Sequence, residues 1–302
     1  MTDAKQTDGA AKPPRPPKRH CKQRLSEIPG FDEHFAEVRG CRLRYLAAGE
    51  GKPLVLVHGL GGAAANWLLL GPLLADERRV LVPELPGHGG SAPLPAAPSL
   101  NAFADRIALL IEREVGPAAV VGHSLGGAIV LRAAIRRPDL VRALVLAGAA
   151  GISSGTRRAR YALHITALVK PGKRIAPYGA VVARSDALKT LVFGRWGVSD
   201  PPALPDAMAH GFLSGPARHS DTISASRALV LDDPRADLER VRCPTLLLWG
   251  ARDHQLPIDD AFEYARRLRA PLRTIADCGH LIIGERPDAC ADAIRSFLAA
   301  SG

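Results

Sequence analysis

The sequence predicts an α/β protein with a mostly parallel, doubly wound sheet and an inserted helical cap. Short apolar runs recur along the chain, and helical patterns of apolar residues lie between them. Runs without polar alternation are typical of strands that helices cover on both faces. Alternating strands and helices then imply parallel strands joined by crossover helices. Residues 152–235 break this rhythm, which indicates an insertion into the sheet domain.

The alternation begins near Phe31, with a hairpin arm expected at 38–47. Strands are expected at 53–57, 79–82, 118–121, 143–147, 244–249 and 272–276. Helices are expected at 66–75, 100–114, 127–137, 259–269 and 287–299. Pro287 suits the first turn of the last helix, because the N–H that proline lacks would be unpaired there in any case.

The composition divides the chain into three parts. Residues 1–24 are rich in proline and hold seven Lys or Arg against two Asp, so they predict a disordered basic tail that cannot bury enough apolar surface to fold. The core is expected at 25–151 and 236–302. Between its two halves, residues 152–235 hold helix-like pieces interrupted by Pro and Gly, and we expect them to form a helical cap over the carboxyl edge of the sheet.

The overall composition excludes several classes of protein. A hydrophobic content of 47% and a charged content of 23% are ordinary for a globular protein. No apolar stretch approaches the length of a membrane span, and the polar N-terminus argues against a secretory signal. Five cysteines without C-x-x-C spacing favour a reducing compartment and no metal site, so we expect a cytoplasmic protein. The basic tail has no interleaved aromatic residues on which bases could stack, so nucleic acid is not an expected partner. The oligomeric state stays open.

The pentapeptide Gly-His-Ser-Leu-Gly, residues 122–126, lies between a strand-like run and a helical pattern. A sharp strand-to-helix turn holds its central serine out towards a substrate, and such a turn needs small residues two places before and two places after. The helix that opens behind Ser124 offers free N–H groups to a developing negative charge. The pattern predicts acyl transfer through an ester of Ser124.

A second match to the same pattern, Gly-Ile-Ser-Ser-Gly, occurs at residues 151–155. The charged cluster TRRAR follows it, with no apolar helical face directly behind. The preceding strand has already ended in the run from Gly148 to Gly151, which predicts a loose exit in place of a tight turn. We interpret the copy around Ser153 as a chance match.

An oxyanion hole needs two N–H donors aimed at one point. The N–H of Leu125, at the start of the helix after the serine, is the first candidate. The second is expected from a glycine-rich loop, and the run His58–Gly62 directly follows the strand 53–57. Its glycines allow the backbone to turn the N–H of Leu60 inward. Glycine-rich turns also occur without this role, but a turn that follows a strand of a parallel sheet favours it.

His280 is the predicted general base. It lies just past the last predicted strand, at the sheet edge where open α/β sheets bind their substrates. The acid that orients it should follow another strand, and Asp253 follows the strand 244–249. Asp277 is too close in sequence to His280 to reach round its ring, and the strand 143–147 ends without an acid.

Taken together, these motifs resemble the α/β-hydrolase fold family over roughly residues 35–299. The resemblance rests on HGLGGAAANW (58–67), ELPGHGGS (84–91), VGHSLGG (121–127), LWGARDHQLP (248–257) and CGHLIIGERPD (278–288). The order Ser, Asp, His is the one this family uses. The family usually has Asp where this chain has Glu84. Members that act as dehalogenases or epoxide hydrolases use an aspartate nucleophile, so Ser124 argues against both.

The resemblance implies acyl-enzyme chemistry on a small-molecule acyl substrate, without a metal or organic cofactor. His280 would take the proton of Ser124, the amides of Leu60 and Leu125 would hold the oxyanion, and Asp253 would fix the imidazole tautomer. A carboxylic ester hydrolase is the leading expectation. The family also contains carbon–carbon bond hydrolases of ring-cleavage products, lactonases, lipases and cofactor-free haloperoxidases, which the sequence does not separate. A non-catalytic ligand receptor is a further alternative that the intact triad disfavours.

The cap is expected to select the substrate. Residues 156–235 hold twelve Lys or Arg against six Asp, and this charge would attract an anionic substrate unless it merely solvates the surface. The apolar and aromatic residues of the cap either line an acyl pocket or, more often in proteins, pack the cap onto the sheet. They are Tyr161, Leu163, Ile165, Leu168, Tyr178, Leu191, Val192, Phe193, Trp196, Met208, Phe212 and Leu213.

Overall fold

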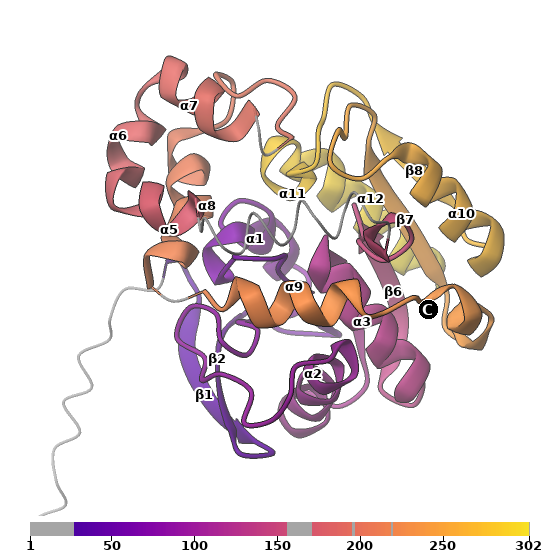
Figure 1. Cartoon of the computed structure of the whole chain (residues 1–302). Coiled ribbons are helices and arrows are strands. Elements are labelled where there is room, and N and C mark those ends of the chain that lie inside the picture. The colour runs from indigo at the N-terminus through magenta and orange to yellow at the C-terminus, as the bar shows by residue number, and fades with distance from the viewer. Residues whose placement is uncertain (1–26, 156–170, 195–196, 219, 302) are drawn as a thin grey trace, which may run out of the picture.

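The structure, a computed structural model, describes residues 27–155, 171–194, 197–218 and 220–301. These residues form an eight-stranded sheet with helices on both faces (Figure 1). The strand order is β1-β2-β4-β3-β5-β6-β7-β8; β1, β2 and β4 pair antiparallel, and all other pairs are parallel. The strands are β1 (Asp32–Val38), β2 (Cys41–Ala48), β3 (Pro53–Val57), β4 (Arg79–Pro83), β5 (Ala118–His123), β6 (Val141–Ala147), β7 (Thr245–Gly250) and β8 (Leu272–Ile275).

The central strands are apolar on both faces because a layer of helices covers each face. In β3, Val55 and Val57 face one buried apolar cluster, whereas Leu54 and Leu56 face the other. The first cluster includes α2 (Leu100–Glu114), α3 (Leu125–Arg136) and α10 (Ile258–Leu268). The second includes α1 (Leu70–Ala75), α11 (Ile282–Glu285) and α12 (Pro287–Ala300). Each fully buried Leu or Val contributes about 1.5–3 kcal/mol.

This architecture confirms the predicted fold class. The predicted helices at 100–114 and 127–137 correspond to α2 and α3, and Pro287 lies in the first turn of α12. The helix expected at 66–75 instead divides into a 3₁₀ turn, η1 (Ala64–Trp67), and α1. The reason is Pro72, which lacks an N–H and therefore fits only the first turn of a helix.

The described elements between β6 and β7 are helices and 3₁₀ turns joined by loops, and we call residues 148–244 the β6–β7 segment. Its elements are η2 (Ser153–Gly155), α5 (Pro171–Ile175), η3 (Ala176–Tyr178), α6 (Gly179–Ala183), α7 (Asp186–Phe193), α8 (Asp206–Arg218), α9 (Thr222–Val230) and η5 (Arg235–Arg240). Helices α5–α8 form a group beside the sheet domain, whereas α9 runs across the helices on its near face (Figure 1). Ala225, Ala228 and Leu229 of α9 belong to the same apolar cluster as α2 and α3. The domain boundaries at 152 and 235 stay a prediction, and the predicted tail, 1–24, lies outside the described residues.

None of the helices in the described ranges is long and apolar enough to cross a bilayer.

Candidate active site

Ser124 occupies the turn between β5 and α3 with φ +56° and ψ −120°, a backbone conformation that L-residues rarely adopt. The turn is tight on both sides. A Cβ atom on Gly122 would lie 2.5 Å from the carbonyl oxygen of Gly126, and one on Gly126 would lie 2.3 Å from the carbonyl oxygen of Val57. Glycine is therefore required at both positions, and the half-buried Ser124 is held out at the start of α3.

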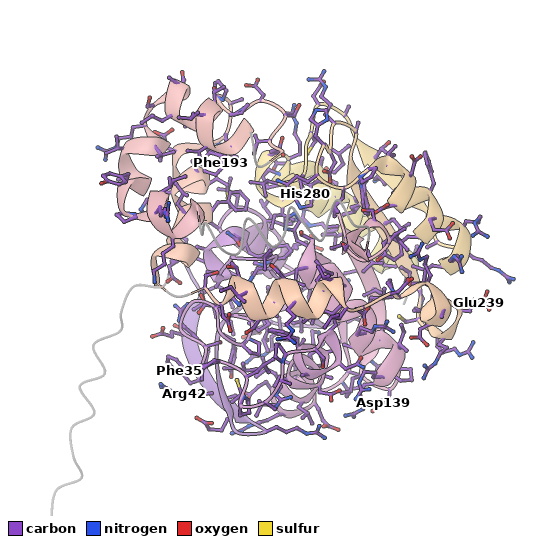
Figure 2. The ribbon with its side chains drawn as sticks, in the orientation of Figure 1. Phe35, Arg42, Asp139, Phe193, Glu239 and His280 are labelled. Atoms are coloured by element: carbon purple, nitrogen blue, oxygen red, sulfur yellow. The ribbon has the colours of Figure 1, made fainter. Side chains whose placement is uncertain are left out.

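The structure brings Ser124, His280 and Asp253 together from three separate loops at the carboxyl ends of strands. Nε2 of His280 lies 3.1 Å from Oγ of Ser124, and Nδ1 of His280 lies 2.8 Å from Oδ2 of Asp253. His280 is 4% exposed, and in Figure 2 it lies in the upper part of the view, as does Phe193 of α7. These are the geometry and order of contacts that a nucleophile, a base and an orienting acid require.

The surroundings of Asp253 stabilise the charged form of its carboxylate. Burial pushes its pKa upward, but the hydrogen bond to His280 and the backbone N–H groups of Leu256 and Gln255 outweigh burial, and the pKa lies below its ordinary value. Both N–H groups donate to Oδ1 at 2.9 Å, which leaves Oδ2 for the imidazole. A charged Asp253 at this point favours the tautomer in which Nδ1 carries the proton and Nε2 can accept one.

His123, directly before the serine, bonds to the backbone of His280. Its Nε2 lies 2.8 Å from the carbonyl oxygen of His280. Burial lowers the pKa of His123 to about 3, so the ring is neutral at neutral pH. Because a carbonyl oxygen only accepts, Nε2 of His123 carries the ring proton and donates it. The last residue of β5 thus holds the backbone of His280, and Ser124 follows it directly in the chain.

The loop after β3 lies against the nucleophile. A Cβ atom on Gly59 would be 3.1 Å from Cβ of Ser124. Behind it, His58 is fully buried, which lowers its pKa to about 3. Its Nε2 accepts from the N–H of Leu85 at 3.0 Å, so Nδ1 donates to the carbonyl oxygen of Gly59 at 2.8 Å. The loop that carries Leu60 is therefore fixed beside Ser124, and the oxyanion role of the Leu60 and Leu125 N–H groups stays a prediction.

Glu84, at the position where the family usually has Asp, is fully buried and ties this loop to its neighbours. Its carboxylate accepts from the N–H groups of Ala64 at 3.2 Å and Gly90 at 2.6 Å, and it pairs with Arg44 at 2.8 Å. A buried carboxylate is tolerated because all these donors satisfy it. The longer side chain thus has a structural function in this chain.

Asp277, the acid weighed against Asp253 in the sequence, and Asp260 of α10 are both engaged elsewhere. Asp277 lies three residues before His280 but pairs with Arg252 at 2.6 Å. Asp260 accepts from both the N–H and the hydroxyl of Ser153, at 3.1 and 2.7 Å. Ser153 lies in the 3₁₀ turn η2, so its hydroxyl faces a carboxylate in place of a histidine.

The predicted cap residues divide into buried and exposed groups. Tyr178 and Leu191 are 65% and 64% exposed, so they line no interior pocket. The buried members belong to the apolar cluster that includes α12 and one face of the sheet, which supports the packing interpretation: Val192, Phe193, Met208, Phe212 and Leu213. Five others lie outside the described residues: Tyr161, Leu163, Ile165, Leu168 and Trp196.

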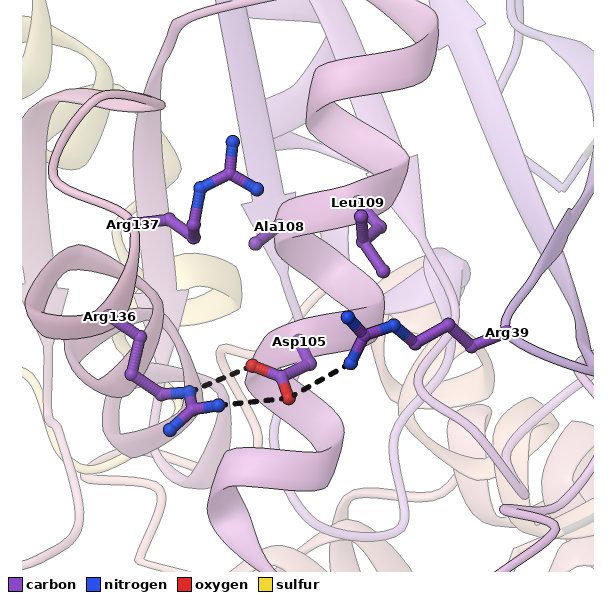
Figure 3. A pocket seen from close by; sticks show the side chains of 6 residues that line it. All are labelled: Arg39, Asp105, Ala108, Leu109, Arg136 and Arg137. Atoms are coloured by element: carbon purple, nitrogen blue, oxygen red, sulfur yellow. Dashed lines mark hydrogen bonds and ion pairs between the residues drawn. The ribbon is translucent and has the colours of Figure 1, made fainter.

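A hollow of about 150 Å³ lies away from the triad, between the β1–β2 turn and helices α2 and α3 (Figure 3). Asp105 in its wall binds Arg136 at 2.8 Å and Arg39 at 3.6 Å, and Arg137 pairs with Glu112 and Asp139. These charges neutralise one another, so we assign the hollow no function. No group of three or more His, Cys, Asp or Glu suited to a metal ion occurs in the part of the chain that the structure describes.

The sequence analysis did not predict the contacts of two residues of the site, His123 and Glu285. His123 stands inside the quoted motif, but nothing local indicates that its ring reaches the carbonyl of residue 280. Glu285 bonds to the loop of His280 from α11: its Oε2 accepts from the N–H of Gly279 at 3.0 Å. Its position five residues after the predicted base was the one available signal.

Comparisons with known proteins show the family to which the chain belongs. The protein-family model described as "Alpha/beta hydrolase family" matches residues 54–293 of this chain. The pimeloyl-[acyl-carrier protein] methyl ester esterase of Aromatoleum aromaticum is 34% identical over 262 residues, covering 79% of this chain and 94% of that protein. The 2-hydroxymuconate semialdehyde hydrolase of Pseudomonas sp. (strain CF600) is 30% identical over 269 residues, covering 86% of this chain and 91% of that protein.

Among solved structures, a serine hydrolase involved in carbazole degradation superposes with a TM-score of 0.69 and 25% sequence identity. The match covers 89% of this chain and 99% of the other.

Proposed function

Because the chain belongs to the alpha/beta hydrolase family and is a hydrolase, we propose that it cleaves a carboxylic ester through an acyl-enzyme intermediate on Ser124. The observation that carries this proposal is the unbroken chain of contacts from Asp253 through His280 to Ser124. A hydroxyl placed 3.1 Å from an imidazole nitrogen can lose its proton to that nitrogen as it attacks. The similarity to a methyl ester esterase supports the choice of an ester bond.

In the proposed reaction, Oγ of Ser124 attacks the carbonyl carbon while Nε2 of His280 takes the hydroxyl proton. The electron pair of the carbonyl bond moves to its oxygen, where the N–H groups of Leu60 and Leu125 would stabilise it. Collapse of this intermediate breaks the ester bond, and His280 returns the proton to the departing alcohol. Water then attacks the acyl group, gives a proton to His280, and releases the acid with Ser124 restored.

A carbon–carbon bond hydrolase is the second candidate, because the 2-hydroxymuconate semialdehyde hydrolase matches over 91% of its length. The same residues would serve, but the leaving group would be a carbon atom that departs with the electron pair and must be protonated. The choice between the two reactions depends on the pocket that receives the leaving group.

We also propose that the helices α5–α8 form the cap and favour an anionic substrate. Lys173, Arg174 and Arg184 are exposed on α5 and directly after α6. If they steer the substrate, added salt should lower kcat/KM for an anionic ester and leave that for a neutral ester level. Equal salt responses would exclude steering.

The four described cysteines are unpaired, as in a reducing compartment, and we place the reaction in the cytoplasm.

The decisive experiment is labelling of the folded protein with a fluorophosphonate, which reacts with an activated serine. We expect one label per chain, located on Ser124 by peptide mass spectrometry. An unlabelled wild-type protein would exclude the serine hydrolase and favour a ligand receptor.

A substrate panel then separates the reaction classes. p-Nitrophenyl esters of increasing acyl length, with a ring-cleavage dienoate alongside, should show which bond is cleaved. Turnover of the esters alone supports the esterase, whereas preferred cleavage of the dienoate supports the carbon–carbon hydrolase. Both activities should disappear in Ser124→Ala.

A further inference from the structure

One carboxylate oxygen joins the loop of the proposed base to the β6–β7 segment. Oε2 of Glu285, at the end of α11, accepts the N–H of Gly279 at 3.0 Å and the N–H of Ser199 at 2.8 Å. Gly279 directly precedes His280, and Ser199 lies six residues after the end of α7. The side chain of Glu285 therefore bonds two peptides that are 80 residues apart in the chain.

The two joined peptides lie in direct contact. The N–H of His280 donates to the carbonyl oxygen of Gly197 at 2.6 Å. A Cβ atom on Gly279 would lie 1.8 Å from that same oxygen, and one on Gly197 would lie 3.0 Å from Cβ of His280. Gly197 has φ +82°, a conformation that favours glycine. The close approach requires both glycines, so a small shift of residues 197–199 would displace the backbone of His280.

The other side of the His280 peptide is also held. Its carbonyl oxygen accepts from Nε2 of His123 at 2.8 Å. The backbone of His280 is thus bonded to β5 through its carbonyl and to the β6–β7 segment through its N–H. The bond from β5 depends on one rigid ring, whereas the bond from the β6–β7 segment depends on how well residues 197–199 stay in place. The N–H of Val198 bonds to the carbonyl oxygen of Phe193 at 3.1 Å, and Glu285 adds the contact that joins these residues to the loop of His280.

We propose that Glu285 is a positioning residue for His280: its carboxylate clamps Ser199 to Gly279 and so keeps the imidazole aligned with Ser124. Glu285 touches neither the substrate nor the reacting atoms, and it transfers no proton. Its role requires an oxygen acceptor at the right distance and no negative charge. The proposal rests on the proposed function, because it assigns His280 as the base.

The test compares three variants by the rate of fluorophosphonate labelling per folded molecule and by amide hydrogen exchange. Glu285→Ala and Glu285→Asp, which is one methylene too short to reach both amides, should label about ten- to a hundredfold more slowly. Glu285→Gln keeps an acceptor oxygen and should stay within roughly threefold of the parent. In the two slow variants, exchange should rise together in peptides containing 197–199 and 279–280.

Asp260→Ala provides the matched control. Asp260 is buried whereas Glu285 is half-buried, but Asp260 likewise accepts from two donors of the β6–β7 segment, both of which belong to Ser153. Its loss should lower the stability without slowing the labelling of the folded fraction. If Asp260→Ala slows labelling as much as Glu285→Ala, or if Glu285→Gln is as slow as Glu285→Ala, the proposal is wrong.

The exchange measurement separates this proposal from the proposed function. An unlabelled parent would refute the serine hydrolase, while increased exchange in both segments of Glu285→Ala would still establish the clamp. A labelled parent whose exchange and labelling do not change in Glu285→Ala would refute the clamp alone. If Glu285→Ala does not fold, Glu285→Asp and Glu285→Gln decide the same question.

Discussion

Ser124 and Ser153 are the central residues of two stretches with the same G-x-S-x-G pattern, and the structure gives them different surroundings. Ser124 caps α3 with φ +56°, and its hydroxyl lies 3.1 Å from His280. Ser153 lies in a 3₁₀ turn, and its hydroxyl donates to Asp260 at 2.7 Å. Asp260 also accepts the N–H of Ser153. The two hydrogen bonds fix Ser153 in place, so its hydroxyl has a structural role.

This difference shows that the partner of the serine, and not the pentapeptide, determines its chemistry. The first copy follows the central strand β5, and the loops after β7 and β8 bring an acid and a histidine to it at the same edge of the sheet. The second follows β6 after three further residues, and α10 approaches it there. Tyr264 of α10 donates to the carbonyl oxygen of Ala150 at 2.8 Å. No tight strand-to-helix turn follows β6 among the described residues, but Gly148–Gly151 is buried where Tyr264 of α10 contacts it.

The largest expected effect is the loss of the serine that faces the histidine. Ser124→Ala should lose fluorophosphonate labelling and reduce hydrolysis by roughly 10⁴-fold or more, because the nucleophile is gone. Ser153→Ala should label at the parent rate and lose about 1 kcal/mol of stability, because Asp260 loses a hydrogen bond. Labelling kinetics measure the reactivity of each serine, and urea unfolding measures the change in stability. Retained labelling in Ser124→Ala, or lost labelling in Ser153→Ala, would reverse the assignment.

The next effect concerns the glycines that only the first copy needs for a tight turn. Gly126→Ala should destabilise the fold by about 3 kcal/mol or more, because its Cβ would meet the backbone oxygens of Val57 and His58 at 2.3 and 2.5 Å. Gly194→Ala is the control, since the nearest atom to its Cβ is 3.8 Å away. It should change the stability by about 0.5 kcal/mol or less. Equal urea midpoints for the two variants would contradict the tight turn.

The remaining effect appears only as the pH falls, and it comes from the residue before each serine, His123 in one copy and Ile152 in the other. The pKa of His123 is about 3 in the folded protein, below the value of about 6.5 in an unfolded chain. As the pH falls below 6.5, the unfolded state binds the proton first, so His123 lowers the stability by up to about 1.4 kcal/mol per pH unit until pH 3.

His123→Gln should remove this contribution and flatten the acid side of the stability curve. Glutamine can still donate to the carbonyl oxygen of His280, so the tether is kept. Ile152→Leu should leave the slope unchanged. Urea unfolding between pH 4 and 7 provides the measurement, and parallel curves for the parent and His123→Gln would show that the buried ring does not titrate as described.

Much of the candidate site could be predicted from the sequence because its side chains follow strands. The apolar runs identify the strands, and the ends of parallel strands meet at one edge of the sheet. Ser124, Asp253 and His280 could be located in this way before any coordinates. Their catalytic roles, and those of the Leu60 and Leu125 amides, await the labelling experiments.

His123 and Glu285 could not be predicted because their partners are backbone groups distant in sequence. The bond from His123 spans 157 residues, and that from Glu285 to Ser199 spans 86. Periodicity reports which face of a helix or strand is buried, but it contains no information on which carbonyl or amide lies opposite a buried ring.

By itself, the sequence determined the alternation of strands and helices, the need for glycine around Ser124, and the residue types available for catalysis. These depend on local backbone sterics and on the burial of apolar side chains, which a one-dimensional pattern records. Only the tertiary structure decided that Ser153 meets Asp260, that His123 reaches the carbonyl of His280, and that Glu285 holds the loop of His280. A hydrogen bond needs its two atoms within about 3.2 Å and in line, and only the folded chain brings distant residues that close.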